Sequence, residues 1–438
     1  FNKQPVTSNL YPATQTFPNF IQNSAVGCLT MHPKDLSIRD YTYELPAERI
    51  AAFPLARRDD SRLLVFRNKR ISESDFRHLA DWIPPGSLMV FNNTRVLEAR
   101  LLFKKPSGGI IEIFALEPPG SFSDIHTALQ QTGEVEWKCL VGGASKWKHG
   151  FVPEKRIPAG NGEIILRAEI RERLSDTFLI RFSWTPAHLT FPEVLHQAGQ
   201  TPLPPYLKRE ADKQDAVRYQ TVYAKEEGSV AAPTAGLHFT TEVLESLKEK
   251  NIDTAWLTLH VGAGTFKPIK AEQLSGHEMH SEFIEVDRDT LEKLAQNQMP
   301  VYAVGTTSLR TLESLYWMGV KTMMNPVISA EELPITQWEV YDRDMPRDIP
   351  VTESIQSLLK WLHEKGLNRL ISHTQILIAP GYSFRMIKGL ITNFHQPQST
   401  LLLLIAALVG DSWKDIYTYA LDHGFRFLSY GDGSLLEV

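Results

Sequence analysis

Between about residue 95 and residue 188 the sequence changes its pattern, and this change constrains the fold more than any other feature of the chain. The segments there are short, rich in β-branched or alternating apolar residues, and separated by Gly, Pro, Asn and Asp. They read VLEARLLF, GGIIEIFALE, WKCLVGG, GEIILRAEI and DTFLIRFSW. Such a run predicts a small antiparallel sheet or barrel.

On both sides of this run the pattern alternates between strands and helices. Residues 43–66 predict an amphipathic helix-like stretch that leads into a short strand at 63–66, and residues 88–91 predict a second, buried strand. Downstream of Pro205 the expected rhythm is strand, loop and helix. The strands expected there cover 254–261, 301–304, 375–378 and 389–391, and the helices cover 242–250, 309–317 and 401–409.

These patterns predict the α/β fold class, with an α/β main domain interrupted by an inserted antiparallel β-barrel-like domain. We assign residues 31–91 and 190–438 to the main domain and residues 92–189 to the insert. A chain of 438 residues agrees with two or three domains at about 150 residues each. Residues 1–30 hold one charged side chain, Lys3, and we interpret them as a disordered lead or a mis-called start.

Composition excludes several classes of protein. The net charge of −5 argues against a histone-like nucleic-acid binder. Two cysteines, Cys28 and Cys139, cannot build a disulfide framework or a cysteine-rich zinc module. The longest apolar run, 401–409, is too short for the roughly 20 residues that cross a bilayer. We therefore expect no membrane association.

Three polar loops each lie between a strand or turn and a helix, at 231–241, 304–310 and 391–400. In open α/β sheets such loops meet at the carboxyl ends of the strands, where ligands bind. Each loop alone is explained by a capped helix, but together they predict a ligand site. Their candidate ligand groups are Thr234, Gly236 and His238, then Thr306, Thr307 and Ser308, and finally Asn393 and His395.

Two other motifs resemble known sites only in part. The segment VGAGTFKP has Gly262 and Gly264, but Lys267 stands where a dinucleotide fingerprint needs its third glycine and Pro268 blocks the helix. The run from His277 to His280 lacks the H-E-x-x-H spacing that places two histidines on one helical face. We therefore expect neither a Rossmann site nor a metal site.

Seven longer motifs resemble, in order, one known family, the S-adenosylmethionine:tRNA ribosyltransferase-isomerases of queuosine biosynthesis. The motifs are TPLPPYL, YQTVYA, GSVAAPTAGLHFT, LHVGAGTFKP, MHSE, AVGTTSLRTLES and LITNFHQPQSTLL, and the resemblance runs from about residue 40 to the end. It implies an α/β domain interrupted by a β-barrel-like domain, as the pattern itself predicts.

The resemblance also implies a reaction. The ribosyl part of S-adenosylmethionine moves onto 7-aminomethyl-7-deazaguanine in the wobble position of a tRNA, and the sugar rearranges to give epoxyqueuosine, adenine and methionine. The implied substrates are S-adenosylmethionine and tRNA, with no further cofactor and no metal. We expect a cytoplasmic protein, because the chain shows no export signal, and we expect a monomer.

Residue roles follow from this chemistry as hypotheses. A sulfonium acidifies the neighbouring carbon, so His280 or Glu282 is assigned to proton transfer, with His238 and His395 as alternates. Arg310 and the 306–308 loop are candidates for binding the methionine carboxylate or a phosphate. The other candidate substrate-binding residues are Thr234, Gly236, Gly262, Gly264, Thr265 and Asn393, and the candidate tRNA-backbone contacts are Lys208, Arg209 and Arg218.

Two positions depart from the family pattern. Asn93 replaces an Asp in the NDTRV motif, and Gln398 replaces a Lys in NFHLPKST. Two alternatives therefore stay open, a tRNA-binding protein without turnover and an S-adenosylmethionine-consuming enzyme with a different acceptor. The intact loops around His238, Gly264 and Thr306 favour an active enzyme, because a binding protein does not need them.

Overall fold

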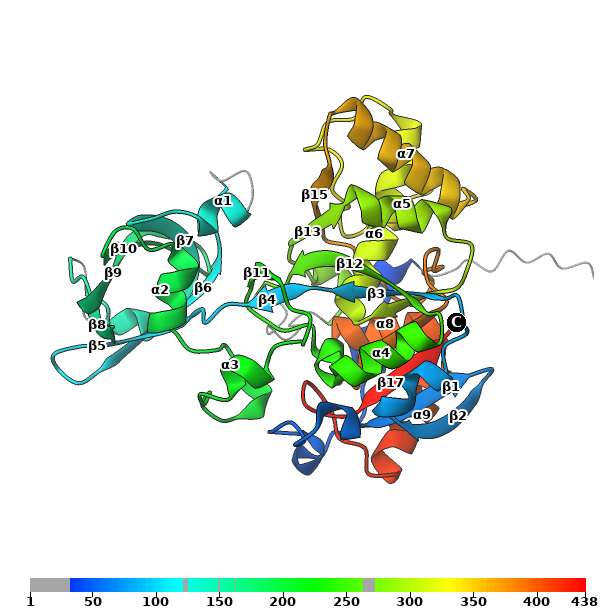
Figure 1. Ribbon diagram of the computed structural model, residues 1–438, viewed down its shortest axis with the longest axis horizontal. Coiled ribbons are helices and arrows are strands. Elements are labelled where there is room, and N and C mark those ends of the chain that lie inside the picture. The colour runs from blue at the N-terminus through cyan, green and yellow to red at the C-terminus, as the bar shows by residue number, and fades with distance from the viewer. Residues whose placement is uncertain (1–31, 121–124, 149, 161, 263–271) are drawn as a thin grey trace, which may run out of the picture. The chain divides into compact units, whose positions relative to one another are not determined.

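The structure is a computed structural model that describes residues 32–120, 125–148, 150–160, 162–262 and 272–438 (Figure 1). The lead at 1–30 lies outside the described residues. In the described part, a large sheet has the strand order β15-β13-β12-β3-β14-β16-β17-β1-β2. Its strands are β1 (Arg62–Arg67), β2 (Arg70–Asp75), β3 (Leu88–Asn92), β12 (Asp253–His260), β13 (Glu282–Asp287), β14 (Val301–Val304), β15 (Arg369–Thr374), β16 (Gly389–Asn393) and β17 (Gly433–Glu437).

The centre of this sheet is parallel. Strands β12, β3, β14 and β16 are hydrogen-bonded neighbours in parallel pairs, so their carboxyl ends share one edge of the sheet. The flanking strand β13 is antiparallel to β12 and β17 is antiparallel to β16, so each of them begins at that same edge. Because antiparallel pairing places Phe283 opposite His260, Glu282 also lies there.

Helices and apolar side chains cover both faces of the large sheet. Along β3, Leu88 and Val90 pack into one apolar cluster and Met89 and Phe91 into another, as alternation along a strand requires. Near-continuous apolar strands of this kind are typical of sheets buried on both sides. The helices are α4 (Thr241–Glu249), α5 (Arg288–Gln296), α6 (Thr306–Met324), α7 (Val351–Glu364), α8 (Thr400–Val409) and α9 (Ser412–Asp422), with a short α3 (Asp215–Arg218).

A second sheet is antiparallel, in the order β5-β6-β7-β10-β9-β8, and its two end strands approach each other so that it is nearly closed. The inward residues of alternate positions form a separate apolar core around Trp137, Phe182 and Phe191. Its elements are β5 (Arg100–Lys104), β6 (Ile110–Glu117), α1 (Ile125–Leu129), β7 (Glu134–Gly142), β8 (Glu154–Ala159), β9 (Gly162–Arg173), β10 (Phe178–Thr185) and α2 (Phe191–Ala198). The predicted fold class is confirmed, and the domain boundaries stay a prediction.

Most expected elements are present, but two predictions are wrong. Residues 43–66 form no α-helix; they contain single 3₁₀ turns at Ala47–Arg49 and Arg58–Asp60 before β1. Pro46 and Pro54 explain this, because proline lacks an amide N–H and disfavours helical conformation in the residue before it. Residues 375–378 form no strand, although 376–378 are buried, because β15 ends at Thr374. In the described ranges, no helix is long and apolar enough to span a membrane.

A third, two-stranded pairing joins β4 (Thr94–Val96) to β11 (Glu226–Ser229), in parallel. Asn92, which is 0% exposed, is the last residue of β3 in the large sheet and precedes β4 of this pairing by two residues. Its Nδ2 donates to the carbonyl oxygen of Leu259 (2.9 Å) and to Thr307 Oγ1 (3.3 Å). Its Oδ1 accepts from the amides of Leu259 and Thr94, both at 3.1 Å. One buried amide therefore joins the ends of β3 and β12, the loop after β3 and the first turn of α6.

Replacing Asn92 with Ala should destabilise the protein strongly. The change leaves the backbone groups of Leu259 and Thr94 buried without partners, which costs about 3 kcal/mol of unfolding free energy. Urea unfolding measures the loss. Asn93→Ala is the matched control, because Asn93 is partly exposed and its side chain has one hydrogen bond, from Thr258. Equal losses in the two variants would contradict this account of Asn92.

Candidate functional site

Polar groups from distant parts of the chain meet at the edge where the parallel strands end. Thr306 begins α6 directly after β14 and Gly305, and Asn393 ends β16. The amide of Gly305 donates to the carbonyl of Ile391 at 2.8 Å, which joins these two loops. Gly305 has φ of 87°, a conformation that favours glycine, and the side chain of Ala235 lies against it. The three loops that the sequence singled out are therefore neighbours.

His238 lies at this edge in a defined tautomer. Asn393 Nδ2 donates to the carbonyl of Leu428 (3.1 Å), which fixes the orientation of the amide, and it lies 3.0 Å from His238 Nε2. Nε2 is therefore the acceptor, and Nδ1–H donates to Ser61 Oγ at 2.9 Å. Burial lowers the pKa of His238 to about 4, so the ring is neutral at pH 7.

His238 also lines a narrow cleft with three arginines, Arg58, Arg218 and Arg426. Arg426 pairs with the buried carboxylate of Asp432 at 3.0 Å. Arg58 and Arg218 donate to backbone carbonyls instead, and Nε of Arg218 is buried without a hydrogen-bond partner. Because the guanidinium groups of Arg58 and Arg218 contact carbonyls and not carboxylates, their positive charges can still attract a ligand. This cleft is therefore suited to an anion.

His395 is close in sequence to Asn393 but has different contacts. Its Nε2 lies 3.0 Å from Thr392 Oγ1, its amide donates to Tyr417 Oη (3.1 Å), and its carbonyl accepts from Tyr43. Burial lowers the pKa of His395 to about 3, so this ring is also neutral at pH 7.

Arg310 and Glu282 form a buried ion pair at the same edge. Arg310 comes from the second turn of α6, and its Nε also donates to the carbonyl of Ile376 at 3.2 Å. Its Nη2 is buried without a hydrogen-bond partner. Because an unpartnered guanidinium N–H is costly inside a protein, it points to an anionic ligand group at this place.

Other predicted substrate-binding residues hold the loops together. Ser308 Oγ donates to the carbonyl of Val304 (2.8 Å), the last residue of β14, and Thr307 Oγ1 accepts from Asn92. A Cβ at Gly236 would lie 2.1 Å from the hydroxyl of Tyr223, so this glycine allows close packing. Thr234 is partly exposed beside it.

The remaining predicted residues differ in their surroundings. Gly262 is partly exposed and has open space where a side chain would lie, whereas Gly264 and Thr265 lie outside the described residues. His280 and Lys208 are exposed. Arg209 is mostly buried and pairs with Asp215 through two contacts of 2.7 Å. The side chain of Arg209 therefore holds its own loop, and Lys208 is the more accessible cation.

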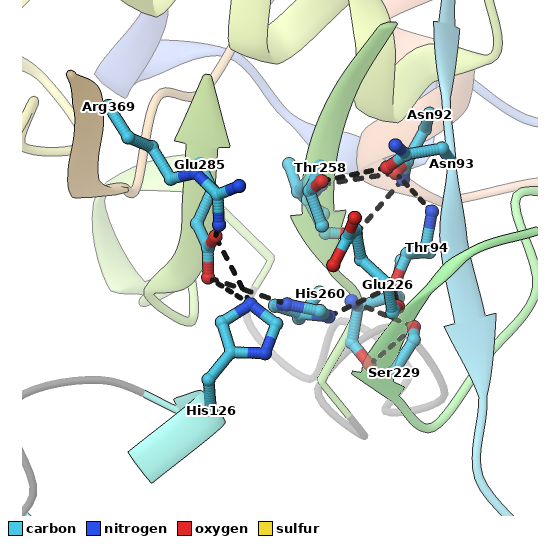
Figure 2. A network of polar contacts seen from close by, with 12 residues as sticks. Asn92, Asn93, Thr94, His126, Glu226, Ser229, Thr258, His260, Glu285 and Arg369 are labelled. Atoms are coloured by element: carbon cyan, nitrogen blue, oxygen red, sulfur yellow. Dashed lines mark hydrogen bonds and ion pairs between the residues drawn. The ribbon is translucent and has the colours of Figure 1, made fainter. Parts of the chain in front are cut away.

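Sequence reasoning missed a second polar centre at this edge, formed by His126, His260 and Glu285 (Figure 2). Burial, with a smaller effect from His126, lowers the pKa of His260 to about 3, and a hydrogen bond with Glu285 raises the pKa of His126. His260 and Glu285 lie within or beside motifs quoted above, but as strand residues they gave no separate signal. His126 comes from a five-residue helix in the antiparallel part and gave none at all.

A cleft of about 490 Å³ lies beside this second centre. Glu285 and Arg369 line it together with the aromatic Tyr223 and Trp256 and with Asn93. Its volume falls in the range of about 300–1,000 Å³ that is common for small-molecule sites.

Lowering the pH should destabilise the protein through its buried histidines. An unfolded histidine titrates near about 6.5, whereas the folded-state pKa of His395 is about 3. Between these values the unfolded chain takes up a proton that the folded protein does not, so stability is lost as the pH falls. His395→Gln should reduce the slope of unfolding free energy against pH by about 1 kcal/mol per unit below pH 6. Urea unfolding at several pH values measures the slope, and equal slopes would contradict the prediction.

Comparison with known proteins identifies relatives over nearly the whole chain. The family model described as "Queuosine biosynthesis protein" matches residues 38–436. A protein of Aromatoleum aromaticum is 37% identical over 414 residues, covering 92% of this chain and 97% of its own length. One of Legionella pneumophila is 37% identical over 404 residues (91% and 99%), and one of Thermotoga petrophila is 36% identical over 412 residues (92% and 100%).

All three relatives are named S-adenosylmethionine:tRNA ribosyltransferase-isomerase. A crystal structure of S-adenosylmethionine tRNA ribosyltransferase from Thermotoga maritima is 27% identical, covers 90% of this chain and 99% of its own, and superposes with a TM-score of 0.42. The match of the family model and the identity to these relatives confirm the resemblance seen in the motifs: the chain belongs to the queuosine biosynthesis protein family.

Proposed function

We propose that this protein is an S-adenosylmethionine:tRNA ribosyltransferase-isomerase. It transfers the ribosyl part of S-adenosylmethionine to 7-aminomethyl-7-deazaguanine in the wobble position of a tRNA and rearranges it, giving epoxyqueuosine-tRNA, adenine and methionine. The observation that carries the proposal is the family match over 38–436 together with relatives of that name at 36–37% identity. Because its second substrate is tRNA, we place the protein in the cytoplasm. We also propose that it acts as a monomer.

The donor site in this proposal is the shared carboxyl edge between His238 and His260. His238 lies beside Asn393 at the end of β16, and His260 is the last residue of β12. The ends of these two strands are three strand spacings apart, which is about 14 Å. The unpartnered Nη2 of Arg310 binds the methionine carboxylate, because a guanidinium N–H forms its strongest hydrogen bonds with carboxylates. The carboxylate of Glu282 lies at the same edge, and its negative charge favours binding of the positively charged sulfonium.

Proton transfer is assigned to the four residues that the sequence suggested. The contacts favour Glu282, because its carboxylate is buried at the edge in an ion pair with Arg310. His238 and His395 are neutral at pH 7 and are alternates. His280 is exposed and precedes Glu282 by two residues, so it is assigned to exchange protons with solvent.

The acceptor base is assigned to the cleft of about 490 Å³. Trp256 and Tyr223 supply aromatic surfaces of the kind on which RNA-binding proteins stack an extruded base, and Asn93 supplies an amide for its polar edge. Asn93 is also a departure from the family pattern. We therefore expect Asn93 to influence which acceptor is used. The alternative hypothesis, an S-adenosylmethionine-consuming enzyme with a different acceptor, differs from the proposed function in this choice.

Incubation of the protein with S-adenosylmethionine and tRNA carrying the aminomethyl base tests the proposal. Adenine and methionine should appear only with that tRNA and not with tRNA carrying guanine at the same position. Binding of the tRNA without adenine release would contradict the enzyme assignment and favour a tRNA-binding protein. Adenine release with another RNA alone would favour the alternative acceptor.

Four single variants test the proton-transfer assignment, namely Glu282→Gln, His280→Ala, His238→Gln and His395→Gln. At least one should lower the single-turnover rate of adenine release by about 100-fold or more, the usual contribution of a general acid or base. His196→Gln is the control, because this exposed histidine pairs with Glu98 and lies outside the edge. Full rates in all four variants would overturn the assignment.

Lys208 tests the assigned contact with the tRNA backbone. Because its side chain is exposed, Lys208→Ala should weaken tRNA binding equally for all sequences, and the slope of log affinity against log salt should fall by about 0.9. Arg209→Ala should instead lower thermal stability, because it leaves the buried carboxylate of Asp215 without its main partner. A salt slope unchanged in Lys208→Ala would exclude Lys208 from the interface.

A further inference from the structure

His126, His260 and Glu285 bring three potential metal ligands together, from α1, β12 and β13 (Figure 2). His126 Nε2 lies 3.0 Å and His260 Nε2 lies 4.0 Å from the same oxygen, Glu285 Oε1. The three ligand atoms all lie within 4.8 Å of one another. Across the described ranges of the chain, no other group of three His, Cys, Asp or Glu residues meets this spacing.

The tautomer of His260 leaves a bare lone pair directed toward Glu285. Thr94 Oγ1 donates its proton to the carbonyl of Glu226 (3.4 Å), so it accepts from His260 Nδ1–H at 2.9 Å. His260 Nε2 is then an acceptor, and it faces a carboxylate oxygen that is an acceptor too. Both atoms are buried without a hydrogen-bond partner, and Glu285 Oε1 has one ion-pair contact, with His126 Nε2 at 3.0 Å.

Two buried acceptors that face each other require a positive group between them. The side chains of His260 and Glu285 are only 3% and 2% exposed, so bulk water does not satisfy these atoms. Each unsatisfied buried acceptor costs about 1–3 kcal/mol. The ion pair with His126 offsets this cost for Glu285 Oε1 but not for the lone pair of His260 Nε2, which a cation bound between the two atoms would satisfy.

We propose that His126 Nε2, His260 Nε2 and Glu285 Oε1 bind one divalent transition-metal ion, with Zn²⁺ as the best match. Two imidazoles and one carboxylate form a ligand set that Zn²⁺ takes in proteins. Bonds of about 2.1 Å in tetrahedral geometry separate ligand atoms by about 3.4 Å. The two distances to Glu285 Oε1, 3.0 and 4.0 Å, lie on either side of that value, so small side-chain rotations complete the site.

The surroundings of the three ligands resemble an outer shell that orients metal ligands. Thr94 holds His260 through Nδ1, and Arg369 Nη1 donates to Glu285 Oε2 at 2.9 Å, leaving Oε1 for the ion. His126, whose side chain is 34% exposed, gives a path from solvent. Metal binding replaces the hydrogen bond that His126 Nε2 makes to Glu285 Oε2 (3.2 Å) and releases its proton.

This inference departs from the metal-free expectation and goes beyond the proposed function. His126 belongs to the segment between β6 and β7, whereas the other two ligands belong to the large sheet. The ion therefore ties α1 to β12 and β13 and sets the position of His260 at the edge assigned to the donor. Its test is metal binding itself, which is independent of ribosyl transfer.

Zinc binding by the full-length protein tests the site. After treatment with a chelator, the protein should take up one equivalent of Zn²⁺ in competition with a chromogenic chelator, and Co²⁺ should give the visible absorption bands of a tetrahedral site. His126→Ala and His260→Ala should weaken binding by about 100-fold or more, and Thr94→Val, which keeps all ligands, by about 10-fold. Zn²⁺ should also raise the thermal midpoint of the unsubstituted protein.

The controls separate a specific site from surface binding. His196→Ala removes a histidine that pairs with one carboxylate, Glu98, and should bind Zn²⁺ as the unsubstituted protein does. Because His126 is partly exposed, His126→Ala should keep the far-ultraviolet circular dichroism spectrum of the folded protein. Equal Zn²⁺ affinity in the unsubstituted protein and folded His126→Ala, or uptake well below one equivalent, would overturn the proposal.

Discussion

The buried amide of Asn92 is the interaction on which the organisation of this protein depends. It binds backbone groups of β12 and of the loop after β3 and touches the first turn of α6, so the ends of neighbouring parallel strands are held in register. Parallel strands end at one edge, and connections from distant parts of the chain must therefore begin there. The loops around His238, Thr306 and Asn393 therefore converge at the edge where these strand ends are held.

Two histidines at this edge have their tautomers set by a neighbour that is itself held by a backbone carbonyl. Asn393 donates one N–H to the carbonyl of Leu428 and the other to His238 Nε2. Thr94 donates its only proton to the carbonyl of Glu226 and therefore accepts from His260 Nδ1–H. Each ring is neutral because burial disfavours its charged form. The difference lies in the second nitrogen: that of His238 is satisfied, whereas that of His260 faces Glu285 without a partner. Of the two histidines at this edge, His238 therefore has both ring nitrogens hydrogen-bonded, whereas His260 has one ring nitrogen without a hydrogen bond.

The sequence predicted features that rest on local pattern. The apolar run that became α8 and the alternating strands of the antiparallel sheet could be read directly, because period and turn residues decide them. The prediction of a helix over 43–66 is wrong, because Pro46 and Pro54 prevent a helix that the apolar spacing alone would favour. The motifs located His238 and Asn393, but they could not show that Arg209 is held by Asp215 or that His126 meets His260. Such pairings depend on tertiary contacts between segments far apart in the chain.

The central claim is that the shared carboxyl edge binds the sulfonium nucleoside. A crystal structure of the protein with a non-reactive S-adenosylmethionine analogue tests it most directly. The account predicts the ligand along the ends of β12, β3, β14 and β16, with its carboxylate on Arg310 Nη2. A ligand bound at another surface, with the environment of Arg310 unchanged, would contradict it.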